Sequence, residues 1–139
     1  MKILITGANG FLGYYIVEQL LAKKYSVIAT GKGECRLPFT HDLNFQWLSM
    51  DFTDPFSIHD TFENIKPGVV VHAGAMSKPD ECAKNKEACY LHNVAATKFL
   101  LDACKKFQPH FIYISSDFIF GENGPHAEDD HESLACRTA

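Results

Sequence analysis

The chain has little of what marks a membrane-bound, secreted or nucleic-acid-binding protein. No apolar run approaches the ~20 residues that a membrane span needs, and Met1 leads directly into an apolar segment with no signal-like stretch before it. Lys and Arg number 13 against 17 Asp and Glu, a formal net charge of −4, which provides no broad basic surface. We therefore expect a cytoplasmic protein with no membrane and no nucleic acid among its partners.

Cysteine and histidine are present, but without the spacings that bind metal. The five cysteines are an odd number with no Cys-x-x-Cys pair, so neither a disulfide framework nor a zinc knuckle is indicated. The seven histidines are scattered without metal-ligand spacing. We predict no metal site. Cys89 and Cys104 fall on helical stripes and are expected to be buried as small apolar side chains.

The remaining composition is that of an ordinary α/β domain, with 139 residues, 46% hydrophobic and 22% charged. Strands are predicted at 2–6, 25–30, 46–50, 68–73 and 110–115, and helices at 11–23, 55–65, 79–85 and 87–107. This alternation predicts right-handed crossovers and a doubly wound, Rossmann-type parallel sheet. We assign residues 1–127 to this domain and 128–139 to an acidic, polar tail.

The first strand runs into a three-glycine turn, the most informative segment of the chain. Gly7, Gly10 and Gly13 follow the strand and open an amphipathic helix. A diphosphate needs close backbone approach, which glycine permits, and unpaired N–H groups, which a helix N-terminus supplies. The alternative is an ordinary glycine-rich turn. The predicted dinucleotide-binding residues here are Gly7, Asn9, Gly10, Phe11, Leu12 and Gly13.

Cations, and no strand-end carboxylate, follow the second strand. NAD-binding folds usually place an Asp or Glu there to accept from the ribose hydroxyls. Here Lys32 and Arg36 follow within a few residues. The sequence therefore favours NADP over NAD as cofactor, with both cations binding the 2′-phosphate. Two alternatives stay open: the cations are solvated loop charges, or Glu34 turns inward.

The Gly-x-x-Gly-x-x-Gly spacing preceded by Thr resembles the extended short-chain dehydrogenase/reductase family. Asp51 and Phe52 resemble the pair that flanks the adenine in that family. The run Ala73, Gly74, Ala75 resembles the family's small-residue segment beside the cofactor ribose. These residues are expected cofactor contacts, and the alternative for the small residues is a close turn.

Asn93 lies on the inward apolar stripe of the long predicted helix, where a buried amide must have partners. The run Asn93-Val-Ala-Ala-Thr97 is similar to the family's Asn-Val-x-Gly-Thr, with Ala96 in place of Gly. The resemblance implies that Asn93 braces the active-site region, and we place it with the cofactor-binding residues.

The fifth strand narrows the resemblance. The run Tyr113-Ile-Ser-Ser-Asp117-Phe-Ile-Phe-Gly is similar to the dTDP-4-dehydrorhamnose reductase branch of the family. The resemblance implies reduction of a 4-keto nucleotide sugar by NADPH, with Ser116 bonding the substrate oxygen and Asp117 adjacent. An NAD-dependent epimerase or dehydratase would use the same residues. Assembly as a homodimer is one option.

The segment from His72 to Asp80 is similar to one in the regulatory subunit of methionine adenosyltransferase. This resemblance implies a different class of function, because a protein of this fold can bind NADP and control a partner without turnover.

The family's Tyr-x-x-x-Lys pair is missing from the sequence. No Tyr follows Tyr113 and no Lys follows Lys106. The resemblance covers the cofactor half of a family member, so we expect weak dinucleotide binding and little or no hydride transfer by this chain. A chance tail, a substitution, and a truncation or frameshift at the motif are the alternatives left open.

Overall fold

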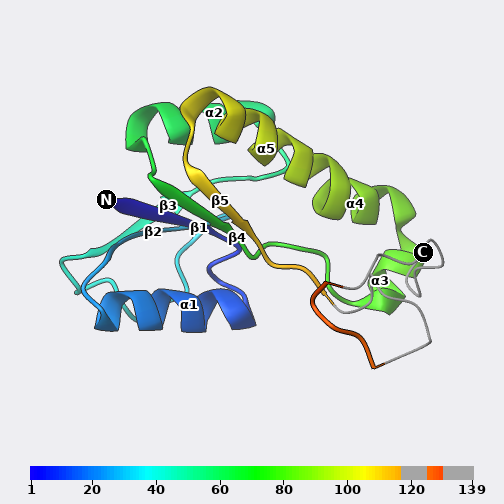
Figure 1. Ribbon diagram of the computed structural model, residues 1–139, viewed down its shortest axis with the longest axis horizontal. Coiled ribbons are helices and arrows are strands. Elements are labelled where there is room, and N and C mark those ends of the chain that lie inside the picture. The colour runs from blue at the N-terminus through cyan, green and yellow to red at the C-terminus, as the bar shows by residue number, and fades with distance from the viewer. Residues whose placement is uncertain (117–124, 130–139) are drawn as a thin grey trace.

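The computed structural model describes residues 1–116 and 125–129 of the chain, which form a parallel sheet with helices on both faces (Figure 1). The strands are β1 (Lys2–Thr6), β2 (Ser26–Gly31), β3 (Phe45–Ser49), β4 (Val69–His72) and β5 (His110–Tyr113). The helices are α1 (Phe11–Ala22), α2 (Pro55–Ile65), α3 (Pro79–Lys84), α4 (Lys86–Tyr90) and α5 (Ala96–Phe107), with a π-helical turn η1 (Leu91–Ala95) between the last two.

The strand order is β3-β2-β1-β4-β5, and every pairing is parallel. The sheet grows in one direction from β1 to β3 and in the other from β4 to β5, so the order reverses between β1 and β4. Ligands of open α/β sheets bind at this switch point, outside the carboxyl ends of the strands. The predicted doubly wound, Rossmann-type fold is confirmed.

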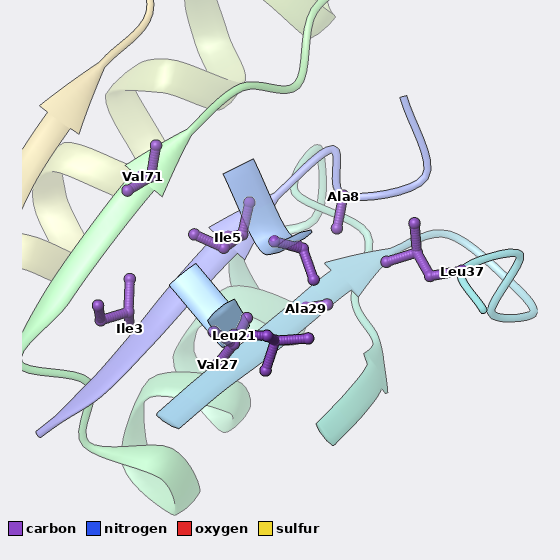
Figure 2. Close-up of a cluster of buried hydrophobic side chains, with 9 residues drawn as sticks. Ile3, Ile5, Ala8, Leu21, Val27, Ala29, Leu37 and Val71 are labelled. Atoms are coloured by element: carbon purple, nitrogen blue, oxygen red, sulfur yellow. The ribbon is translucent and has the colours of Figure 1, made fainter. Parts of the chain in front are cut away.

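One face of the sheet is covered by α1, as Figure 1 shows. Alternate residues of a strand point to opposite faces, and Ile3 and Ile5 of β1 are buried on the α1 side with Val17 and Leu21. Figure 2 shows Ile3 and Ile5 beside Val27 of β2 and Leu21 of the helix. Burial of these aliphatic side chains supplies the hydrophobic driving force that holds α1 on the sheet.

The other face is covered by α2 and α5 (Figure 1). Leu4 of β1 points to this side and is buried with Phe62 of α2 and Leu100 of α5. Cys104 is buried in the same cluster, as predicted, whereas Cys89 is only half-buried.

Helix α2 begins where the sequence predicts. The Asp54 carboxylate accepts a hydrogen bond of 3.0 Å from the Phe56 N–H, and Pro55 occupies the first turn. The helix ends at Lys66, which has a left-handed φ of 50°.

The helix predicted over 87–107 is present in the structure, although it is not α-helical throughout. Helical backbone runs through the segment, but residues Leu91–Ala95 form a π-helical turn between α4 and α5. A π turn inserts an extra residue, so the side-chain register before it differs from the register after it. The strand predicted at 110–115 ends at Tyr113, and that at 68–73 spans Val69–His72.

The predicted boundary near residue 127 falls in the short segment 125–129, and most of the predicted tail lies outside the described residues. The division into domain and tail stays a prediction.

Candidate functional site

The glycine turn between β1 and α1 is a backbone-lined cradle at the switch point. Gly7 has a φ of +68°, which L side chains rarely adopt, and a Cβ there would lie 2.6 Å from the Gly74 Cα. A Cβ on Gly13 would lie 2.3 Å from the Gly7 oxygen, so α1 approaches the turn closely. Both glycines are therefore required by backbone packing.

Gly10 differs from its two neighbours. An added Cβ would approach the Gly7 oxygen at 3.1 Å, and among residues 1–116 and 125–129 no other contact within 4 Å is found beyond its chain neighbours and its own helix. Gly10 is the N-cap of α1 and makes no side-chain cap, so the first turn of this 12-residue helix has no side-chain acceptor at its N-cap. Open space beside the helix N-terminus is the arrangement a pyrophosphate needs.

The other predicted residues of this turn divide by exposure. Phe11 is 84% exposed and Leu12 43%, so both flank the turn on the surface. Asn9 directs its side chain away from the turn. Its amide donates to the Glu34 oxygen at 2.9 Å and accepts from the Arg36 N–H at 3.0 Å.

These two hydrogen bonds tie the glycine turn to the loop after β2. The cofactor contact predicted for Asn9 stays a prediction, and in the structure its side chain braces the two segments against each other. The same loop is held at Gly33, whose N–H donates to the Ser49 hydroxyl at 3.2 Å and whose oxygen accepts from the Trp47 indole at 3.2 Å.

Lys32 and Asp51, predicted for opposite ends of the adenosine moiety, are bonded to each other. The Lys32 ammonium lies 2.8 Å from the Asp51 carboxylate. Burial raises the pKa of Asp51, but hydrogen bonds from Lys32 and Thr53 outweigh it and lower the pKa to about 2. Asp51 is therefore ionised at neutral pH. Arg36 is exposed, and no ion pair with it occurs within the described residues.

Phe52 packs on Gly74 in the segment after β4. A Cβ on Gly74 would lie 2.6 Å from a Phe52 ring carbon, so the aromatic ring fills that space. Ala73 is half-buried, with its N–H donating to the Thr6 oxygen at 3.3 Å, and Ala75 is exposed. The small residues thus permit close contact with both the glycine turn and Phe52, as expected if they are small because the chain turns closely there. They also lie at the switch point of the sheet, where ligands bind.

Asn93 clamps the backbone that follows these small residues. Its side-chain oxygen accepts from the Met76 N–H at 2.8 Å, and its amide donates to the Met76 oxygen at 3.0 Å. The amide also lies 3.4 Å from the Cys89 sulfur. The partners that a buried amide needs are present, and they fix the loop rather than extend toward open space.

A buried histidine at the end of β4 was not singled out from the sequence. His72 is 1% exposed and lies between two hydroxyls, with Thr6 Oγ1 at 2.6 Å from Nδ1 and Thr97 Oγ1 at 3.3 Å from Nε2. The Thr97 hydroxyl lies 3.0 Å from the Asn93 main-chain carbonyl, which can only accept, so we assign its proton to that carbonyl; Thr97 then accepts from Nε2–H, and Thr6 donates to Nδ1. His72 is therefore the neutral Nε2–H tautomer, and burial lowers its pKa to about 4.

The sequence could have indicated this network through the pairing of the two strands that carry Thr6 and His72. Thr6 and His72 end neighbouring parallel strands and pair across the sheet. His72 also meets the Phe52 ring at a centroid distance of 5.4 Å. The network connects the glycine turn, the Phe52 contact and the helix that carries Asn93.

Ser116 is exposed and follows β5 by three residues, at the same edge of the sheet. Asp117 lies outside the described residues. Within the part of the chain that the structure describes, no group of three or more His, Cys, Asp or Glu is placed to hold a metal ion. No helix among those residues is long and apolar enough to cross a membrane.

Comparison with known proteins agrees with this geometry. Residues 3–139 match the model of the "NAD dependent epimerase/dehydratase family". The chain is 29% identical over 131 residues to the spore coat polysaccharide biosynthesis protein SpsK of Bacillus subtilis, covering 93% of this chain and 41% of SpsK. It is 28% identical over 130 residues to methionine adenosyltransferase 2 subunit beta of Rattus norvegicus, covering 93% and 36%.

Among solved structures, a hypothetical dTDP-4-dehydrorhamnose reductase from Sulfolobus tokodaii is 31% identical with a TM-score of 0.77, covering 96% of this chain and 46% of that one. Pal from Bacillus thuringiensis shares the fold with a TM-score of 0.86 at 24% identity, covering 96% and 45%. The chain thus spans less than half the length of these relatives. From the family match over nearly its whole length, the chain belongs to the NAD-dependent epimerase/dehydratase family, in the extended short-chain dehydrogenase/reductase superfamily.

Proposed function

We propose that this chain is the dinucleotide-binding half of an NADP(H)-dependent oxidoreductase that reduces a 4-keto nucleotide sugar. The observation that carries the proposal is the cradle at Gly10, where the described part of the chain leaves space beside the N-terminus of α1 and provides no side-chain cap. The residues present fit a dinucleotide, because Gly7 and Gly13 leave only backbone at the turn and the Asn9 brace places the ribose-side loop next to it. Phe52 and Asp51 border the same edge.

The preference for the phosphorylated cofactor rests on Lys32 and Arg36. Both side chains are exposed in a loop that is fixed to Asn9, which donates to the Glu34 oxygen at 2.9 Å and accepts from the Arg36 N–H at 3.0 Å. Two cations and no strand-end carboxylate suit a 2′-phosphate.

The reductase assignment rests on the likeness to a hypothetical dTDP-4-dehydrorhamnose reductase at 31% identity and on the place of Ser116. When bound, the reduced cofactor supplies a hydride to a carbonyl carbon. Ser116 would donate a hydrogen bond to the carbonyl oxygen from the carboxyl end of β5. No Tyr follows Tyr113 in the sequence, so we expect cofactor binding without efficient turnover from this chain alone.

The cradle is tested by Gly10→Val. The added side chain would occupy the space assigned to the pyrophosphate, and we expect NADPH affinity to fall at least ten-fold, measured by calorimetric titration. Gly68→Val is the matched control, because Gly68 lies at the amino end of β4, and the nearest described atoms to an added Cβ belong to the flexible Met1 side chain and, at 3.9 Å, the Lys2 oxygen. Unchanged affinity in a folded Gly10→Val variant would contradict the assignment.

A regulatory role is the second candidate, favoured by the 28% identity to methionine adenosyltransferase 2 subunit beta. The two roles can be distinguished by assays on a protein that contains this sequence and has the full length of the relatives. Oxidation of NADPH with a 4-keto nucleotide sugar supports the reductase. Co-purification with a methionine adenosyltransferase, without such oxidation, supports the regulatory role. Conversion of a nucleotide sugar without net NADPH consumption indicates an epimerase or dehydratase instead.

A further inference from the structure

Lys32 and Asp51 form an ion pair, although the sequence assigns each of them to a different part of the cofactor, Lys32 to the 2′-phosphate and Asp51 to the adenine. The Lys32 side chain is 82% exposed and that of Asp51 29% exposed, yet the ammonium and carboxylate lie 2.8 Å apart. Lys32 follows the end of β2 and Asp51 follows β3, at the carboxyl edge of the sheet where ligands bind. The pair therefore joins the residue predicted to bind the 2′-phosphate to the residue predicted beside the adenine.

Asp51 is held in a fixed orientation. Its Oδ1 atom accepts from the Thr53 hydroxyl at 2.6 Å and from the Thr53 N–H at 2.9 Å, leaving Oδ2 for Lys32. The low pKa of Asp51 and the raised pKa of Lys32, which the Asp51 hydrogen bond causes, keep both groups charged at neutral pH. The carboxylate is thus a preformed partner for the ammonium.

The loop that carries Lys32 is also held. The Met50 N–H donates to the Gly31 oxygen at 3.0 Å, which joins the end of β2 to the segment containing Asp51. Gly33 is bonded to Ser49 and Trp47, both of β3. The backbone of Lys32 therefore lies between two anchored residues, Gly31 and Gly33. Its exposed side chain can pair either with Asp51 or with an anion of a ligand bound nearby.

We propose that Asp51 sets the cofactor selectivity of this site by competing with the 2′-phosphate for Lys32. The inference rests on the proposed function, since it requires that a dinucleotide binds here. A 2′-phosphate must draw the ammonium away from the carboxylate, or share it, while a second negative charge stands nearby. NADH has no 2′-phosphate, so it neither uses Lys32 nor meets that repulsion. Asp51 therefore narrows the preference for NADPH, and Arg36, without an ion pair in the described residues, supplies what preference remains.

The experiment is a double-mutant cycle on the dissociation constants of NADPH and NADH, with Asp51→Asn, Lys32→Ala and the double variant. Asn keeps the Oδ1 acceptor for Thr53 and removes the charge. The two cofactors share every group except the 2′-phosphate, so the ratio of their affinities cancels any other contact that Asp51 makes. Exposed ion pairs are weak, so we expect Asp51→Asn to raise the NADPH-to-NADH affinity ratio about two- to five-fold.

Lys32→Ala should lower the ratio, and most of the Asp51→Asn gain should vanish in the Lys32→Ala background. Lys105→Ala breaks a matched exposed pair, Lys105–Asp102 at 2.8 Å on α5, and should leave the ratio unchanged. An equal change in both affinities on Asp51→Asn, or the same gain with and without Lys32, overturns this inference alone. Absence of binding by either cofactor to the folded wild-type chain overturns the proposed function, and this inference with it.

Discussion

At the scale of single residues, His72 gives the sheet a pH-dependent stability. In the unfolded chain its imidazole takes up a proton near its ordinary pKa of 6.5, whereas burial holds the pKa to about 4 in the folded chain. Between these values the unfolded state binds more protons, so the free energy of unfolding falls as the pH falls. Above the ordinary pKa of 6.5 the imidazole is neutral in both the folded and the unfolded chain, so His72 no longer lowers the free energy of unfolding.

We expect His72 to lower the free energy of unfolding by about 3 kcal/mol as the pH falls from about 6.5 to about 4. The measurement is urea unfolding of the wild-type chain and of His72→Gln across that range. The amide of Gln can both donate and accept, as the imidazole does, but does not titrate. His41→Gln, at an exposed histidine, is the control. Identical pH slopes for the wild-type chain and His72→Gln would contradict the network.

The site residues show what the sequence can and cannot predict at this scale. The left-handed φ of Gly7 and the close packing at Gly13 follow from glycine spacing, because no other residue tolerates those positions. The side-chain direction of Asn9 and the pairing of Lys32 with Asp51 depend on where β2 and β3 place their loops in space. Local sequence carries no information on those distances.

At the scale of elements, the strands and helices can be predicted from apolar periodicity. The place where the backbone departs from α-helical periodicity lies at the candidate site. Residues Leu91–Ala95 form a π turn inside the helix predicted over 87–107, and Asn93 lies within it. The sequence predicts that the amide needs partners, but the partners are backbone groups of Met76, which is 17 residues away. Such a tertiary contact can shift a helix register that local propensity leaves regular.

The clamp predicts a local effect of Asn93→Ala. Loss of both hydrogen bonds leaves the Met76 N–H and oxygen without their partner, and we expect the free energy of unfolding to fall by about 1–3 kcal/mol. Hydrogen exchange of the Met76 amide should quicken more than exchange in β1. Asn64→Ala is the control, because Asn64 is exposed and both of its side-chain hydrogen bonds within the described residues go to Asp60 of the same helix. Equal losses in the two variants would argue against a clamp.

At the scale of the whole molecule, the parallel sheet brings segments far apart in the sequence to one edge. The glycine turn, the Lys32 loop, Asp51 and the Ala73–Ala75 segment all follow the carboxyl ends of neighbouring strands. We infer that this edge binds a dinucleotide, although the chain spans only 41% of SpsK and 36% of the methionine adenosyltransferase subunit.

The most direct test is backbone amide chemical-shift mapping of the chain titrated with NADPH. We expect the largest changes at Gly7–Gly13, in the loop after β2 and at Ala73–Met76, with little change at the carboxyl end of α2, which precedes the amino end of β4 at the opposite edge of the sheet. A folded chain whose spectrum does not respond to NADPH, or responds mainly at the carboxyl ends of α2 and α5, would contradict dinucleotide binding at this edge.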